Sequence, residues 1–170
     1  MVSQMGKVFV RVAILALFLS LFCLPVSAQS GSNTVRKQVF ALTSKYANEK
    51  GVLAMSCEEG VKLQTVKMML RKEFGSDFAN AIKAFAIIIY KDAPTETRSK
   101  IVGEIAGITD SLQEIDIKDK MKKGEVARGY IRQSGDKSKI TDLLIVVQAP
   151  SPKLIYICGE FDTETAQIVR

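Results

Sequence analysis

Residues 140–161 read Ile-Thr-Asp-Leu-Leu-Ile-Val-Val-Gln-Ala, then Pro-Ser-Pro, then Lys-Leu-Ile-Tyr-Ile-Cys-Gly-Glu-Phe. Two runs rich in β-branched residues flank a reversal marked by two prolines, and this pattern is typical of a β-hairpin. Both runs alternate little between apolar and polar residues, as strands do when they are buried on both faces in the middle of a sheet. We therefore expect the rest of the chain to pack against this hairpin.

The segments before this hairpin predict four more strands. Residues 52–56 and 82–90 are apolar runs of strand length, and the second is so continuously apolar that we expect it inside the sheet. Residues 112–117 alternate between apolar and polar side chains, and residues 126–133 follow as a further strand. The last four strands of the chain would then form a meander.

Three segments carry apolar residues at helical spacing, namely residues 34–48, 61–74 and 95–108. Ser56 and Glu59 fit the capping box, in which two side chains satisfy free amide groups at the start of a helix. This motif predicts that the second helix is capped by Ser56.

Together these elements predict a single α+β domain. The expected order is α-β-α-β-α followed by a four-stranded meander, in a two-layer sandwich with a mostly antiparallel sheet of about six strands. We expect the helices to pack on one face of the sheet, with helix 95–108 beside helix 61–74. The domain would span residues 34–170 after a polar linker at residues 29–33, with a short helix at residues 162–170.

The N-terminus has the pattern of a cleaved export signal, because a basic segment precedes an apolar run at residues 12–24. The small residues Val-Ser-Ala then lead to an expected cleavage between Ala28 and Gln29, so residues 1–28 would be the signal peptide. The apolar run is shorter than the about 20 residues of a membrane anchor, and Phe22 before Cys23 does not fit a lipoprotein signal. We expect an exported protein, periplasmic or secreted, without stable membrane insertion after cleavage.

Composition argues against several functional classes. The chain has 24 Lys and Arg against 18 Asp and Glu, mixed along the sequence, and this mild charge together with export makes nucleic acid a poor candidate partner. Histidine is absent, which excludes histidine-based catalytic triads and zinc sites with imidazole ligands. We expect no cofactor, and the sequence leaves the oligomeric state open.

Carboxylates near two strand ends are weak candidates for a metal site. Glu58 and Glu59 follow the first strand, and Glu160, Asp162 and Glu164 follow the last. If these two strands were neighbours that run the same way, the acids could converge on one edge and bind a hard cation through oxygen ligands. The spacing matches no calcium loop, however, and acids at strand ends are usually solvated. We therefore assign no catalytic residue and no metal ligand.

Two cysteines, Cys57 and Cys158, would remain after signal cleavage. An oxidising compartment permits a disulfide between them, provided that the strands bring their Cα atoms within about 7 Å. Two separate buried thiols are the interpretation that we favour, because free cysteine is among the most buried residue types. A cysteine nucleophile is disfavoured, since the two glutamates after Cys57 would raise the pKa of its thiol.

Several of these patterns occur together: the export signal, a helix at residues 40–48 ending before Lys-Gly-Val, the apolar strand at residues 82–90, and the closing Asp-Leu-Leu-Ile-Val-Val…Leu-Ile-Tyr-Ile-Cys-Gly-Glu-Phe. In them the chain resembles domain-of-unknown-function family 4252, secreted or lipid-anchored proteins of Gram-negative envelopes, over roughly residues 35–165. The resemblance implies a fold and an envelope location, and it carries over no catalytic residue. Many relatives look like lipoproteins, and Phe22 before Cys23 departs from that pattern.

The sequence thus favours a non-enzymatic envelope protein that binds a partner or ligand through one face or edge of its sheet. The alternative is an envelope enzyme that depends on carboxylates or on a metal. A third hypothesis is a mildly basic module that adsorbs to anionic glycans or lipid, and its binding should weaken steeply with salt.

Overall fold

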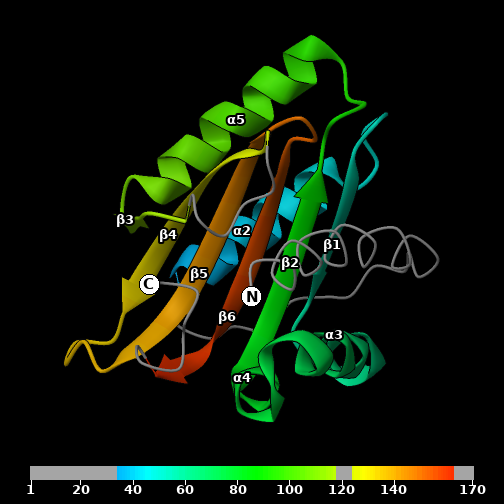
Figure 1. Cartoon of the computed structure of the whole chain (residues 1–170). Coiled ribbons are helices and arrows are strands. Elements are labelled where there is room, and N and C mark those ends of the chain that lie inside the picture. The colour runs from blue at the N-terminus through cyan, green and yellow to red at the C-terminus, as the bar shows by residue number, and fades with distance from the viewer. Residues whose placement is uncertain (1–33, 118–123, 163–170) are drawn as a thin grey trace.

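The computed structural model describes residues 34–117 and 124–162, arranged around one six-stranded sheet (Figure 1). The strand order is β1-β2-β6-β5-β4-β3, and every neighbouring pair is antiparallel. The strands are β1 (Leu53–Cys57), β2 (Ile82–Ile89), β3 (Gln113–Ile115), β4 (Val126–Gln133), β5 (Lys139–Ala149) and β6 (Lys153–Asp162). The helices are α2 (Thr34–Tyr46), α3 (Gly60–Phe74), α4 (Ser76–Ala81) and α5 (Thr95–Thr109). The α+β class and the six-stranded antiparallel sheet that the sequence predicts are confirmed.

The predicted hairpin is the middle of this sheet. β5 and β6 pair with each other, with Leu144 opposite Tyr156 and Ile145 opposite Ile155, and each also pairs with a second strand. Strands β3 to β6 form the expected meander. Because both strands of the hairpin are interior, their side chains are buried on both faces, which explains why the sequence hardly alternates there.

One face of the sheet is covered by α2 and α5, and we call it the α2/α5 face. Apolar side chains of both helices pack there against alternate residues of β2, β5 and β6, including Val39, Leu42, Ile101 and Ile105 against Ile88, Leu144 and Leu154. Glu104 of α5 accepts hydrogen bonds from Lys45 at 2.6 Å and from Tyr46 at 2.7 Å, which joins α5 to α2. The hydrogen bond from Lys45 lowers the pKa of the Glu104 carboxyl. The prediction that the helices all pack on one face of a two-layer sandwich is therefore wrong, because of the described helices only α2 and α5 lie on this face.

The opposite face, which we call the α3/α4 face, carries the other two helices. Leu63, Val66, Leu70 of α3 and Phe78 of α4 join the apolar cluster on this face. Helix α5 therefore packs with α2, and the prediction that it lies beside α3 is wrong. The physical reason lies in β2, where Phe85 and Ile87 face α3 while Ala86 and Ile88 face α2 and α5. A strand that is apolar on both faces needs cover on both.

The start of α3 and the presence of α4 differ from the prediction. Ser56 stays within β1, and Glu59 precedes the first residue of α3 without making a side-chain capping bond, so the predicted capping box is wrong. The strand competes for these residues, because Cys57 still pairs with Phe85 of β2. Helix α4 was not predicted, since six residues are too few to show a helical period.

Helix α4 is held against β6 by aromatic packing. The ring of Phe78 is 4% exposed and stacks on Phe161 of β6, with 4.6 Å between the ring centroids. A Cβ atom at Gly159 would lie 2.5 Å from the carbonyl oxygen of Ala81, so glycine is what allows the end of α4 to approach the strand. The predicted helix at residues 162–170 lies almost entirely outside the described residues.

Candidate functional site

The carboxylates singled out from the sequence reach one edge of the sheet without forming one site. β1 and β6 run in the same direction, with β2 between them, so their C-terminal ends reach the same edge. Three of the acids are paired with separate basic side chains: Glu58 with Arg36, Glu160 with Lys83, and Asp162 with Lys139. Glu59 precedes α3, and Glu164 lies outside the described residues. Within residues 34–117 and 124–162, no three side chains of the metal-binding types come together.

The two cysteines form no disulfide and are buried on opposite faces of the sheet. Cys57 belongs to the apolar cluster of the α3/α4 face and Cys158 to that of the α2/α5 face, with β2 between their strands. The structure therefore does not bring them together for the disulfide that the sequence left open. Burial raises the pKa of the Cys57 thiol to about 11, with Lys62 opposing the shift. At neutral pH this thiol is protonated, so it is a poor nucleophile.

A buried polar cluster that sequence reasoning missed lies on the α2/α5 face. Asp142 of β5 is 0% exposed and faces neighbours on both adjacent strands. The hydroxyl of Tyr156 donates to Oδ1 of Asp142 at 2.6 Å. Arg132 donates through Nε to Oδ2 at 2.7 Å, and the Thr141 hydroxyl donates to the same oxygen at 2.9 Å. The cluster therefore joins the three strands β4, β5 and β6 around one carboxylate.

The electrostatics of this cluster favour a structural role. Burial raises the pKa of the Tyr156 phenol far above its ordinary value, and the charge of Asp142 adds to the shift, so Tyr156 remains a donor. Both oxygens of Asp142 are engaged by donors from the protein. Within the described residues, no buried side-chain nitrogen or oxygen lacks a hydrogen-bond partner. A cluster whose donors and acceptors already satisfy one another needs no ligand.

One feature of the sequence could have revealed this cluster. Asp142 is an acidic residue inside a run that otherwise predicts an interior strand. A carboxylate in such a place is rarely buried without a partner, so a buried ion pair could have been predicted there. The partners could not be named, because Arg132 and Tyr156 lie 10 and 14 residues away and meet Asp142 only through the strand register.

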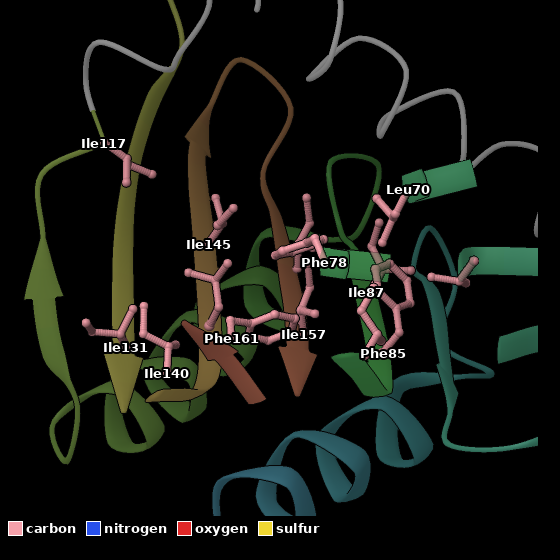
Figure 2. Packing of buried hydrophobic residues seen from close by; sticks show 14 of the residues in the cluster. Leu70, Phe78, Phe85, Ile87, Ile117, Ile131, Ile140, Ile145, Ile157 and Phe161 are labelled. Carbon is pink, nitrogen blue, oxygen red and sulfur yellow. The ribbon is translucent and has the colours of Figure 1, made fainter. Parts of the chain in front are cut away.

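The α3/α4 face contains a region over which the described chain places no helix. Helix α3 contacts β1 and β2, and α4 contacts β6, so both lie toward one side of the sheet, away from β4 and β5 (Figure 1). Over β4 and β5 the same face presents Gly129 and otherwise aliphatic side chains, and Figure 2 shows Ile131 and Ile145 among the aliphatic ones. We call this region the apolar half-face, and it consists of Ile131, Leu143, Ile145 and Val147.

The apolar half-face is bordered by the segment that contains β3. Ile115 and Ile117 lie over Gly129 of β4, where an added Cβ atom would be 2.8 Å from Cγ2 of Ile117. The absence of a side chain at Gly129 thus allows this segment to fold close to β4. The half-face itself contains no acid, base or nucleophile, so it can bind by shape and apolar contact and cannot perform acid–base or covalent chemistry by itself.

Comparison with protein-family models, with curated proteins and with solved structures finds no match for this chain. The resemblance to family 4252 therefore stays a prediction. None of the helices in the described ranges combines the length and the apolar character needed to cross a bilayer.

Proposed function

We propose that this protein is an exported, non-enzymatic module of the cell envelope, periplasmic or secreted, that binds an apolar partner through its apolar half-face. The observation that carries the proposal is the half-face itself: four large aliphatic side chains on β4 and β5, with no helix of the described chain over them. These four side chains are at most 6% exposed in the structure, and a contiguous apolar group of this kind is typical of an interaction site once it becomes accessible. The export pattern at residues 1–28 supports the location.

The chemistry of the half-face defines the class of partner. Burying one Val, Leu or Ile side chain contributes about 1.5–3 kcal/mol, so several such side chains can support stable binding of an aliphatic surface. A charged or sugar-like ligand would bring polar groups to the half-face, and it would leave them without hydrogen bonds. We therefore expect the partner to present aliphatic side chains.

The carboxylate enzyme is not proposed further. Its acids are distributed among separate ion pairs along the sheet edge. The one buried carboxylate, among those in the described ranges, has both oxygens occupied by Tyr156, Arg132 and Thr141. Among the described residues, these arrangements occupy Glu58, Glu160, Asp162 and Asp142 in separate contacts, so none of these four acids is paired with another for catalysis.

Photocrosslinking in the cell tests the proposal. A photoreactive amino acid is placed at Ile145, on the half-face, and in a matched strain at Val146, the adjacent residue on the α2/α5 face. We expect a discrete crosslinked partner from position 145 of the exported protein and none from position 146. The same adducts from both positions, or none from position 145 in folded protein, would contradict the proposal.

A further inference from the structure

Strand β1 forms one edge of the sheet. It stands first in the strand order, so within residues 34–117 and 124–162 no strand pairs with its outer side (Figure 1). Natural proteins usually protect a free edge with charged residues, proline, a β-bulge or a very short strand. The sequence of β1 is Leu-Ala-Met-Ser-Cys, and its register with β2 has no shift. The other edge strand, β3, has only three residues. β1 is therefore the edge at which a further strand can be added.

The edge of β1 is accessible, although helices contact both faces of the strand. Helix α2 packs against β1 on one face and α3 on the other. The first four residues of β1 are nevertheless partly exposed, whereas Ile87 and Ile88, which lie opposite two of them on β2, are 1% and 0% exposed. The remaining exposure therefore lies at the outer edge, where main-chain groups can form hydrogen bonds.

The main-chain groups of β1 alternate between β2 and this outer edge. At the end of β2, the amide of Tyr90 donates to the carbonyl oxygen of Pro152 at 3.2 Å, so Tyr90 faces β6. Successive residues of a strand direct these groups to opposite sides, so Ile89 faces β1, as does every second residue before it. Ala54 and Ser56 therefore direct their N–H and C=O groups to the outer edge. The residues of β1 that complete the ladder with β2 are Leu53, Met55 and Cys57.

The residues of β1 match one another in an antiparallel pair of two copies. If Met55 lies opposite its own counterpart, Ala54 of each copy lies opposite Ser56 of the other, and these residues exchange main-chain hydrogen bonds. The small side chains of Ala54 and Ser56 then meet on the α2/α5 face. The two Met55 side chains meet on the α3/α4 face, where flexible methionine adapts to an irregular gap. A second copy thus satisfies the outward main-chain groups and fits the side chains of this edge.

Charged residues of opposite sign flank β1. Lys50 precedes the strand and Glu58 and Glu59 follow it. Glu58 is paired with Arg36, and Lys50 and Glu59 are both exposed. In an antiparallel pair the basic end of each copy meets the acidic end of the other, whereas a parallel pair would bring like charges together. The flanking charges therefore favour antiparallel pairing of the chain with itself.

We propose that this protein forms a dimer in which the β1 edges of two copies pair antiparallel and join their sheets. The contact is isologous, because each copy offers the same edge to the other. Five residues per copy make a small interface, so we expect a dimer that dissociates in the micromolar range. β4 and β5 lie toward the other end of the sheet, so the proposal does not rest on the binding role of the half-face. The dimer would present two half-faces on the same side of the joined sheet.

Sedimentation equilibrium of the purified exported protein tests the proposal through the flanking charges. Lys50→Glu and Glu59→Lys should each weaken dimerisation about fivefold or more, because like charges then meet at both ends of the strand pair. An equimolar mixture of the two variants should regain the parent affinity, since every contact again joins opposite charges. The matched control is Arg128→Glu on β4, which should leave dimerisation unchanged. A parent protein that stays monomeric into the millimolar range, or a mixture that associates no better than the single variants, would overturn the proposal.

A disulfide at the two-fold axis locates the contact. The two Met55 residues form a pair without mutual main-chain hydrogen bonds, so their Cα atoms would be about 4.5 Å apart, within the range of a disulfide. Met55→Cys should therefore give an intermolecular disulfide in air-oxidised protein, identified by peptide mass spectrometry, whereas Val102→Cys, 53% exposed on α5, should not. Equal yields at both positions, or none at position 55 in folded protein, would overturn the proposal. A disulfide from position 55 to a different envelope protein would show a foreign strand at this edge and would overturn self-pairing.

Discussion

Strands β4 and β5 present opposite chemistry on their two faces. On the α2/α5 face, Asp142 is buried among Arg132, Tyr156 and Thr141, and helices of the described chain cover the neighbouring residues. On the α3/α4 face, the same strands present only aliphatic side chains, and no helix of the described ranges lies over them. On the first face, the buried polar groups already form hydrogen bonds with one another. The half-face on the second face carries no polar side chains that need a hydrogen-bond partner, so it can accept different apolar occupants.

The largest effect is expected from breaking the polar cluster. Asp142→Ala leaves the buried hydroxyl of Tyr156 and the partly exposed guanidinium of Arg132 without their acceptor, and removal of one partner from a buried ion pair costs about 3–5 kcal/mol. Denaturant unfolding measures this loss. The control Asp162→Ala removes an exposed ion pair with Lys139 and should cost at most about 1 kcal/mol. Equal losses for the two variants would show that the cluster is not the anchor of β4, β5 and β6.

The second prediction compares the two faces directly. Leu144→Ala on the α2/α5 face should cost about 2–5 kcal/mol both in the full chain and in the form lacking residues 1–28. Ile145→Ala on the half-face should cost less in both forms, because Ile145 is less deeply buried and no helix of the described ranges lies over it. Thermal and denaturant unfolding of the four proteins checks this. Equal costs for Leu144→Ala and Ile145→Ala would mean that the half-face is covered as fully as the α2/α5 face.

The third prediction concerns the border of the half-face. Gly129→Ala would place a Cβ atom 2.8 Å from Ile117, and such overpacking costs about 1–3 kcal/mol. Gly103→Ala on α5 is the matched control, since nothing lies within 4 Å of the added atom and alanine favours a helix. The control should therefore be neutral or stabilising by up to about 1 kcal/mol. If both variants unfold alike, the segment at Ile117 does not hold the border of the half-face.

The smallest expected effect is a pH dependence of the free energy of unfolding, and its source is Cys57 on the α3/α4 face. The pKa of Cys57 is raised by burial to about 11, so its neutral form stabilises the fold fully below the ordinary thiol pKa. This contribution is lost as the pH rises through about 11. The free energy of unfolding should therefore fall less between pH 8 and pH 11 for Cys57→Ala than for the parent protein. A parallel decline of the two proteins would contradict the burial of this thiol in the folded state.

The elements of the fold could largely be predicted, because apolar periodicity depends on neighbours in sequence. Strand β4 was predicted with its observed bounds, and the hairpin of β5 and β6 within one residue at each end. The face that each helix covers could not be predicted, since β2 is apolar on both sides and accepts either arrangement. The Asp142 cluster depends on a register that shifts between Ile140 and Asp142, and no local pattern encodes such a shift.

The predicted carboxylate site shows that the position of a side chain can be predicted while its partner cannot. The sequence places Glu58 and Glu160 at strand ends, and both do reach the same edge of the sheet. Their partners, Arg36 and Lys83, come from α2 and β2, so the charges are neutralised by residues distant in sequence. The tertiary fold decides which acids come together, and the ion pairs of these acids could not be predicted from residue type and spacing alone.

The most direct test of the binding surface measures apolar probe binding to purified protein that lacks residues 1–28. The variant Val147→Thr keeps the shape of a half-face side chain and adds a hydroxyl, and Val146→Thr makes the same change on the α2/α5 face. Titration with a fluorescent apolar dye should show binding that Val147→Thr weakens severalfold and Val146→Thr leaves unchanged. Binding that neither variant weakens, or no binding at all, would contradict the account that the half-face is the binding surface.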